Sequence, residues 1–266
     1  MLSLSFLKKG GIIVLYGRNT IMNLQEKKEF VLENLHFVPE EEKNLFNFNF
    51  VCVLTRNSVG MESGKRASLE EVVSIIRGFN VKVDETLKRS VYNHYNAYNM
   101  MLKYLNENET KELTEDFLKD LHAELTKGIL ESGGLYRNVN IKIKGSMHTP
   151  CDYIKVYDRM KKFFYDVNNS NKSAIETAAY AHLQLAKIHP FLDGNGRLAR
   201  LVLDFFLIKA DYAPISIPAK RRLEYFDLLE EFKVNKNSLP FEKFVEELLN
   251  KEYDRLIEMI TRYKND

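Results

Sequence analysis

The 266-residue sequence lacks tryptophan altogether and has only two cysteines. Cys52 and Cys151 lie far apart and form no CxxC pair, which excludes a disulfide framework and favours a reducing, cytoplasmic location. Neither sign of charge is in excess, because 39 Lys and Arg residues stand against 37 Asp and Glu residues, a net charge of +2. This balance excludes a protein held to nucleic acid by bulk positive charge.

Long hydrophobic runs are also missing. No segment reaches the roughly 18–20 apolar residues that a membrane span requires, and the nearest, Ile12–Tyr16, is flanked by basic residues. The N-terminus has neither a long apolar region nor a small-residue cleavage site, so it does not resemble a signal peptide. We expect no contact with a membrane. Met22 could be the natural start, with residues 1–21 an upstream extension, and the sequence leaves this open.

Hydrophobic residues make up 45% of the chain and include 17 Phe and 14 Tyr, enough for a sizeable core. Periodic apolar spacing predicts a mainly α-helical domain. Ser68 and Glu71 form a capping box, and Thr114 is a second expected N-cap. The expected helices are Gln25–Leu35, Ser68 to Gly78, Asp84–Leu105, Thr114–Leu130, Ile154–Val167, Ser173–Ile188, Arg197–Ala210, Arg222–Val234 and Pro240–Tyr263.

Two segments have strand-like patterns. Phe46–Leu54 alternates before it becomes continuously apolar, and a strand is the local interpretation, although periodicity alone also allows a buried helix. Val139–Ile143 alternates too, and Gly145-Ser146 and a second extended stretch to Pro150 follow it. This predicts one β-hairpin, which is too small to be stable alone and should lie over another part of the molecule.

The segment richest in chemistry runs from His189 to Arg200 and reads HPFLDGNGRLAR. Pro190 disfavours helix at the residue before it, so the preceding helix should end at His189. Gly194 and Gly196 bracket Asn195 and allow a turn that directs backbone N–H groups inward, just before the next helix begins. Such a turn at a helix N-terminus is suited to binding phosphate.

The side chains of this segment match that chemistry. Arg197 and Arg200 lie about one turn apart on the same helix face and can bind phosphate oxygens. Asp193 can hold a hard cation such as Mg²⁺, and His189 can accept a proton from a hydroxyl group. Each feature alone is common in ordinary structural roles. Together, within twelve residues, they indicate phosphoryl or nucleotidyl transfer.

These residues resemble the signature of the Fic family, H-x-F-x-[DE]-G-N-G-R-x-x-R, at every fixed position. The likeness extends to Gly134-Leu-Tyr136-Arg137, which is similar to the family's G-x-[YF]-R segment, and to the stretch from Lys220 through Tyr225 to Leu228. It covers roughly residues 50–250. The resemblance implies a Fic-type helical bundle with a β-hairpin flap over the active site.

It also implies a protein adenylyltransferase, which moves AMP from ATP to a Ser, Thr or Tyr hydroxyl of a target protein and releases pyrophosphate. In that scheme His189 is the base, Asp193 binds Mg²⁺ and Phe191 anchors the loop. The flap, with Ile141, Lys142, Ile143 and Lys144, pairs with the target's backbone. The implied nucleotide-binding residues are Gly194, Asn195, Gly196, Arg197, Arg200 and Tyr225.

A second resemblance concerns inhibition. Ser58 and Glu62 are similar to the family's inhibitory motif [ST]-x-x-x-E-[GN], although Ser63 replaces the usual Gly or Asn. Glu62 would form an ion pair with Arg200 where the γ-phosphate belongs, and Ser58 would hold the segment in place. The alternative is that Glu62 is a loop carboxylate in a linker. We divide the chain into an N-terminal extension (1–50), an inhibitory segment with the following helix (51–80) and a catalytic core (81–266).

Two other functions stay open. The same site could remove AMP from a modified target, alone or as one activity of a bifunctional enzyme. The chain could also be a non-catalytic interaction module that a nucleotide regulates. The expected partners are a target protein with an exposed hydroxyl and the protein itself through automodification, and a homo-oligomer is left open. The scattered histidines, including His94, His122, His148 and His182, are expected to be structural rather than metal ligands.

Overall fold

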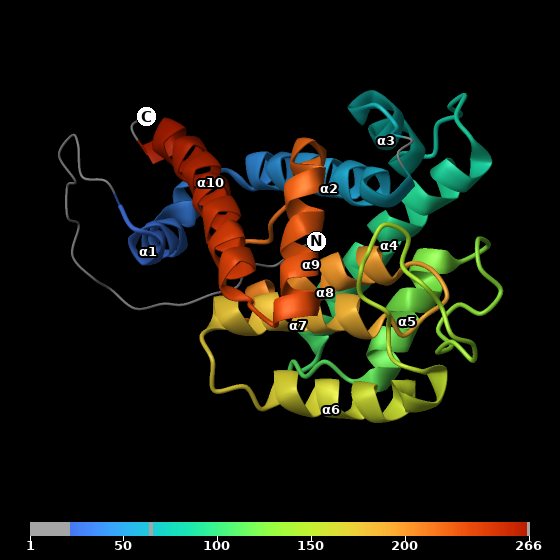
Figure 1. The fold of residues 1–266 in the computed structure, drawn as a ribbon. Helices are drawn as coiled ribbons and strands as arrows, with labels where there is room; N and C mark the ends of the chain where they lie inside the picture. Colours follow the sequence, from blue (N-terminus) through green and yellow to red (C-terminus); the bar gives the residue numbers. More distant parts are fainter. Residues whose placement is uncertain (1–21, 64–65, 265–266) are drawn as a thin grey trace.

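A computed structural model describes residues 22–63 and 66–264, without the side chains of residues 62 and 63. The proposal about residues 1–21 therefore lies outside the described residues. The predicted mainly α-helical fold is confirmed (Figure 1). The α-helices are α1 (Leu24–Asn34), α2 (Glu40–Ser63), α3 (Leu69–Ile76), α4 (Glu85–Glu107), α5 (Glu115–Thr126), α6 (Val156–Asn168), α7 (Ala174–Ile188), α8 (Asn195–Lys209), α9 (Arg222–Asn235) and α10 (Leu239–Lys264). Short 3₁₀ turns lie at Leu35–Phe37, Tyr153–Lys155 and Ala219–Arg221.

Local capping explains where several helices begin. The Ser68 side chain accepts a hydrogen bond from the Glu71 backbone, and the Glu71 side chain accepts one from the Ser68 backbone, so the predicted capping box is confirmed. Thr114 likewise caps α5 by accepting from the backbone N–H of Phe117. These side chains satisfy N–H groups that have no partner within the helix, and so they set the helix starts.

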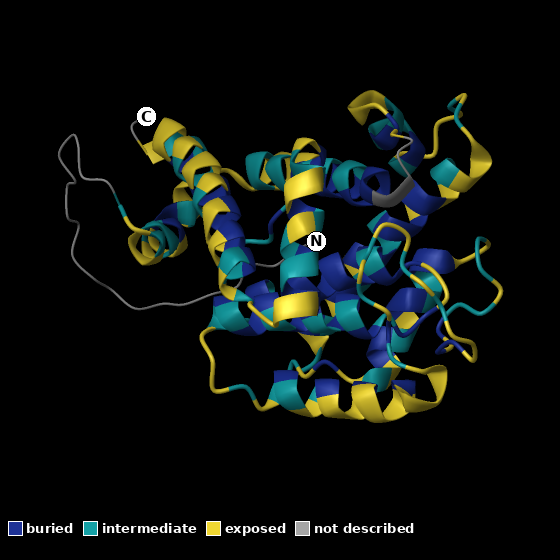
Figure 2. Cartoon of the chain, viewed as in Figure 1, coloured by how far each residue is buried: buried dark blue, intermediate teal, exposed yellow. Residues whose placement is uncertain are grey.

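Helix α8 is the centre of the fold. Twelve of its 15 residues are buried, because it contacts α7, α2, α4 and α5. Its sequence after the first turn is almost continuously apolar, as expected of a helix covered on every side. Outer helices such as α6 and α10 are instead buried on one face and exposed on the other (Figure 2). Helices α7 and α8, which the His189–Arg200 segment joins, are therefore largely buried.

The expected strand at Phe46–Leu54 is wrong, because these residues lie inside α2. Buried side chains recur there with helical spacing, at Phe50, Leu54, Thr55 and Ser58, and face the rest of the bundle. The run was too short for local alternation to distinguish a strand from a buried helix. Helix α2 runs without interruption from Glu40 to Ser63, so it crosses residue 50, where the N-terminal extension was expected to end.

The expected β-hairpin is also wrong as secondary structure, because no residue of 22–63 or 66–264 lies in a β-strand. Residues 139–150, which we call the flap, form an irregular loop with a turn closed by a hydrogen bond from Ser146 N to Ile143 O (3.1 Å). The predicted alternation of side chains persists, since Ile141 and Ile143 are half-buried while Lys142 and Lys144 are exposed. An isolated two-stranded ribbon is marginal in water, and here side chains of other elements support the loop instead.

Other expectations concern the cysteines and the membrane. Cys52 and Cys151 are both free thiols, and burial raises the pKa of Cys52 to about 11. Within the described ranges, no helix has the length and apolar character needed to cross a bilayer.

Three histidines are buried in the helical core: His94 on α4, His122 on α5 and His182 on α7. Burial lowers the pKa of His122 to about 4 and the pKa values of His94 and His182 to about 3. The folded protein therefore holds these rings neutral at pH values where the unfolded chain protonates them.

We expect this difference to make the fold sensitive to mild acid. Because the folded pKa of His122 lies below its unfolded value of about 6.5, its contribution is fully present above pH 6.5 and is lost as the pH falls towards 4. Between pH 7.5 and pH 5 this single histidine should lower the free energy of unfolding by about 2 kcal/mol. Urea unfolding at pH 7.5 and at pH 5 measures the difference in the free energy of unfolding.

The matched variant is His122→Gln, which keeps one donor and one acceptor but cannot be protonated. Its loss of stability between pH 7.5 and pH 5 should be smaller than that of the wild type by about 2 kcal/mol. His36→Gln, at an exposed position, should retain the wild-type pH dependence. Equal pH dependence in His122→Gln and the wild type would show that His122 is not held neutral by the fold.

Candidate active site

The candidate site is built around the loop between α7 and α8. Helix α7 ends at Ile188, and His189 follows in the left-handed conformation (φ 53°), with its N–H bonded to Leu185 O at 3.0 Å. The predicted helix end at this histidine is confirmed. Gly194, with φ 78°, then turns the chain into the first residue of α8. The loop therefore places a histidine at the end of one buried helix and, at the start of another, backbone N–H groups that have no acceptor within that helix.

The imidazole of His189 is half-buried and oriented by its own helix. Its Nδ1 lies 3.2 Å from Ala186 O, and its backbone carbonyl accepts a hydrogen bond from Arg137 Nε at 2.9 Å. With Nδ1 protonated and donating to Ala186 O, Nε2 holds the lone pair that a general base needs.

His122 holds the far side of the loop. The N–H of Gly134 donates to His122 Nδ1 at 2.9 Å, so the other nitrogen, Nε2, carries the ring proton and donates to Asp193 O at 2.8 Å. The ring also stacks on Phe191, with centroids 3.7 Å apart and planes 8° apart. The predicted anchor role of Phe191 agrees with its complete burial. Both nitrogens of His122 thus serve the loop, and the expectation that it is structural rather than a metal ligand agrees with this geometry.

Glycine is required at position 194. Besides its positive φ, an added Cβ would lie 3.0 Å from Thr126 Cγ2 and 3.2 Å from His122 Nε2. The loop therefore lies directly against α5, where any larger side chain would move it.

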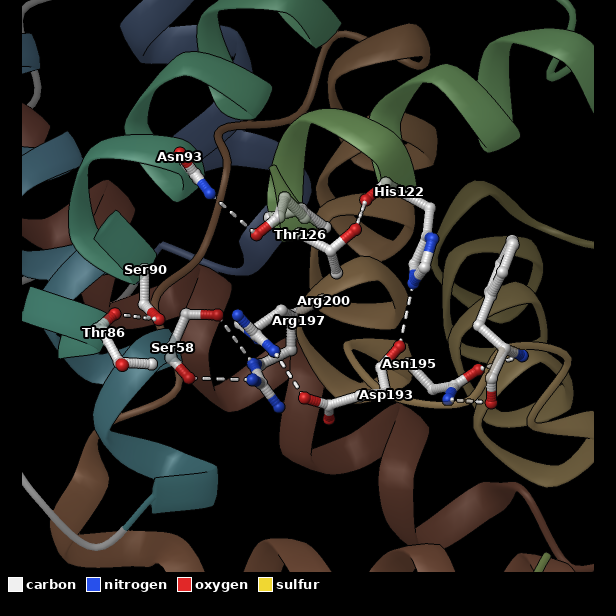
Figure 3. A network of polar contacts seen from close by, with 12 residues as sticks. Ser58, Thr86, Ser90, Asn93, His122, Thr126, Asp193, Asn195, Arg197 and Arg200 are labelled. Atoms are coloured by element: carbon white, nitrogen blue, oxygen red, sulfur yellow. Dashed lines mark hydrogen bonds and ion pairs between the residues drawn. The ribbon is translucent and has the colours of Figure 1, made fainter. Parts of the chain in front are cut away.

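The Asn195 side chain does not have the expected role in binding the nucleotide. Its Oδ1 accepts from Phe191 N and its Nδ2 donates to Phe191 O, both at 2.9 Å. The side chain is buried and closes the loop on itself, so it is not free to bind a phosphate (Figure 3). Only the backbone of Asn195, with that of Gly194 and Gly196, remains as the predicted phosphate cradle.

The two arginines of α8 are both buried, at 6% and 5% exposure for Arg197 and Arg200. Arg200 donates from Nε to Ser58 Oγ at 2.9 Å and from Nη2 to Ser58 O at 2.8 Å. Arg197 Nη2 lies 3.5 Å from Asp193 Oδ2 (Figure 3). Two guanidinium groups thus converge beside the loop, where they raise the local positive potential.

Asp193 is the one carboxylate that the loop contributes, and its side chain is 62% exposed. Among the described residues, no group of three or more His, Cys, Asp or Glu side chains forms a metal site. One exposed carboxylate is nevertheless the donor type that Mg²⁺ uses when phosphates and water supply its other ligands. The residues present therefore fit a magnesium ion that arrives with a nucleotide.

Tyr225 lies behind Arg200 rather than at an open surface. It is 1% exposed, its hydroxyl accepts from Arg200 Nη1 at 3.4 Å, and the same hydroxyl lies 3.0 Å from His182 Nε2. In this structure no face of its ring is open to an adenine base. Its position indicates that it supports the guanidinium, as an aromatic residue of the core.

The inhibitory segment is described only in part. Ser58 is buried on α2, and its hydroxyl accepts a hydrogen bond from Arg200. Glu62 lies in the last turn of α2, but its side chain is outside the described residues, and its expected ion pair with Arg200 stays a prediction. Arg222 donates from Nε to Met61 O at 2.7 Å and so holds the C-terminal turn of α2 in place.

Arg137 is an important residue whose role the sequence did not reveal. Its backbone N–H donates to Pro190 O at 2.9 Å, and its side chain donates to the carbonyls of His189, Val139 and Cys151. It thereby joins both ends of the flap to the start of the loop. The available signal was only its place in the Gly134–Arg137 segment, because its acceptors are backbone atoms of distant residues.

The chain is similar to known proteins in sequence and in fold. Residues 112–207 match the model of the Fic/DOC family. A protein named protein adenylyltransferase Fic from Drosophila persimilis is 29% identical over 205 residues, which are 74% of this chain but 39% of that relative. A relative of the same name from Drosophila grimshawi is 28% identical over 205 residues. The chain thus spans well under half the length of the relatives that it matches.

Solved structures share the fold. A Fic domain-containing signalling protein from Bacteroides thetaiotaomicron superposes with a TM-score of 0.78 at 20% identity, over 91% of this chain and 97% of that protein. Residues 134–508 of Fic-1 from C. elegans superpose with a TM-score of 0.73 at 20% identity, over 90% of this chain and 71% of the other. Residues 112–207 thus match the Fic/DOC family model, and the overall fold of the chain is that of these solved Fic structures.

Proposed function

We propose that this protein transfers AMP from ATP to a Ser, Thr or Tyr hydroxyl of a target protein. The observation that carries the proposal is the loop between α7 and α8, where His189 ends one helix and the next helix, beginning at Asn195, bears two buried arginines. The name of the relatives, protein adenylyltransferase Fic, supports the same activity.

In the proposed reaction, each of these groups has one role. His189 accepts the proton of the target hydroxyl, and the oxygen attacks the α-phosphorus of ATP. The bond from that phosphorus to the bridging oxygen breaks, and pyrophosphate leaves. The backbone N–H groups at the start of α8 and the guanidinium groups of Arg197 and Arg200 stabilise the negative charge of the phosphates. Asp193 would hold a magnesium ion, which neutralises phosphate charge when it is bound.

We further propose that α2 inhibits this reaction. Ser58 occupies two of the donors of Arg200, and Glu62, one turn further along the helix, would take the place of the γ-phosphate. Removal of AMP from a modified target by the same site remains the second candidate. Incubating a modified target with the wild type and with Glu62→Gly separates the two directions, since only reversal lowers the AMP content of the target.

His189→Ala should abolish transfer. Loss of a general base typically lowers the rate by about 10²–10⁴-fold, while the phosphate-binding groups stay in place. We therefore expect labelling with radioactive ATP to fall by that factor and ATP binding, measured by calorimetry, to persist. His36→Ala, at an exposed position outside the site, is the control and should label normally. Normal labelling by His189→Ala would exclude His189 as the base, and with it this mechanism.

Glu62→Gly should activate the protein. A hydrogen bond to a charged group contributes about 1.5–3 kcal/mol, so its loss should raise the automodification rate by at least about tenfold. Mass spectrometry after incubation with ATP, Mg²⁺ and lysate measures the added mass and the modified residues. Glu41→Gly, at the other end of the same helix, should leave the rate unchanged. Equal rates in Glu62→Gly and the wild type would rule out the inhibitory role but leave the transfer activity intact.

A further inference from the structure

The flap lacks the strand pairing that would give it a defined shape. Among the described residues, the only backbone hydrogen bond that joins two flap residues runs from Ser146 N to Ile143 O. At its base the flap is held by Arg137, as described above, and by Asn140, whose side chain contacts Asp152 and the backbone of Tyr153. These contacts order the stem and leave the tip to be held by something else.

The tip is held by α9. The Glu230 carboxylate accepts a hydrogen bond from the Ser146 hydroxyl through Oε1 and another from the backbone N–H of Met147 through Oε2, at 3.0 Å. The Ser146 hydroxyl oxygen in turn accepts from the N–H of His148 at 3.2 Å. Both oxygens of one carboxylate thus bind consecutive flap residues, which defines the direction of the chain at the tip.

Lys233 completes the arrangement. Its ammonium group lies 3.0 Å from Glu230 Oε1 and 3.5 Å from Ser146 Oγ. The side chains of Lys233 and Glu230 are only 5% and 21% exposed, so water screens this pair less than an ordinary surface ion pair. Burial by itself would raise the pKa of Glu230, but hydrogen bonds from Ser146 and Lys233 lower it overall, so the carboxylate is charged at neutral pH. We call Ser146, Met147, Glu230 and Lys233 the clasp.

The clasp connects the flap to the site by a single rigid element. Helix α9 carries Glu230 at the flap and Tyr225 at Arg200, five residues apart. The flap also contacts the end of α7, where His148 Nε2 lies 3.1 Å from Lys187 O, two residues before His189. Arg200 and His189 have partners of their own outside the clasp, at Ser58 and Ala186, so loss of the clasp contacts alone should free the tip of the flap and leave these two residues in place.

We propose that Glu230 is a positioning residue that holds the flap in the shape to which a target segment binds. This inference rests on the proposed transfer activity, in which the flap receives the target. No backbone hydrogen bond within the flap involves Ile141 or Lys142, so a target segment can pair with their backbone groups while the clasp holds the chain in place. Preorganisation by the clasp lowers the entropy lost when the target binds.

The first experiment measures hydrogen exchange in the flap of the full chain. In Glu230→Gln and Ser146→Ala, amides of residues 141–149 should exchange at least about tenfold faster than in the wild type, with the largest effect at Met147. Glu231→Gln is the matched control, because Glu231 contacts Asn235 and Asn237 and not the flap. Unchanged exchange rates in Glu230→Gln and Ser146→Ala would show that the clasp does not order the flap.

The second experiment adds Glu230→Gln to the activated Glu62→Gly protein. Labelling of the most strongly modified lysate protein should fall about tenfold through a higher KM for that protein, while the dissociation constant for ATP changes less than twofold. Equal target labelling despite faster flap exchange would overturn the positioning role. If Glu62→Gly labels no protein at all, the transfer activity and the target-binding role both fail, whereas the exchange result still decides whether Glu230 orders the flap.

Discussion

The structure depends on the need to pair a buried guanidinium. Arg200 is 5% exposed, and an uncompensated charge there would cost several kcal/mol. Its donors reach Ser58 on α2 and Tyr225 on α9, so three helices from distant parts of the chain must meet around it. Any ligand that takes a donor of Arg200 competes with α2. The same constraint therefore connects the packing of the bundle with the proposed inhibition, because phosphate and helix α2 offer acceptors to one cation.

The loop that carries His189 illustrates a second principle. The loop has no regular secondary structure, and side chains make hydrogen bonds to its backbone groups instead. His122 bonds to the backbone of Asp193, Asn195 to that of Phe191, and Arg137 to that of His189. Each of these side chains is buried and satisfied. A loop held in this way keeps its N–H groups and imidazole in fixed positions, and in the proposed transfer such preorganisation would be the main source of catalytic power.

Much of the fold was predictable from the sequence. The helices, the capping box at Ser68 and the helix end at His189 all follow from interactions within a few residues, and they were predicted correctly. Phe46–Leu54 and the flap were not, because an apolar run or a short alternation fits several structures until neighbours select one. Tyr225 was expected at the nucleotide, yet packing placed it behind Arg200, since its environment comes from α7, α8 and α10.

The sequence by itself determined the helical class, the loop with its histidine, carboxylate and arginines, and the family that these residues resemble. Each of these features depends on residues that lie close together along the chain. The tertiary structure decided which partners those residues have: Ser58 for Arg200, His122 for the loop and Glu230 for the flap. Such pairs are separated by about 70 to 140 positions, and their meeting depends on how whole helices pack, which no local pattern encodes.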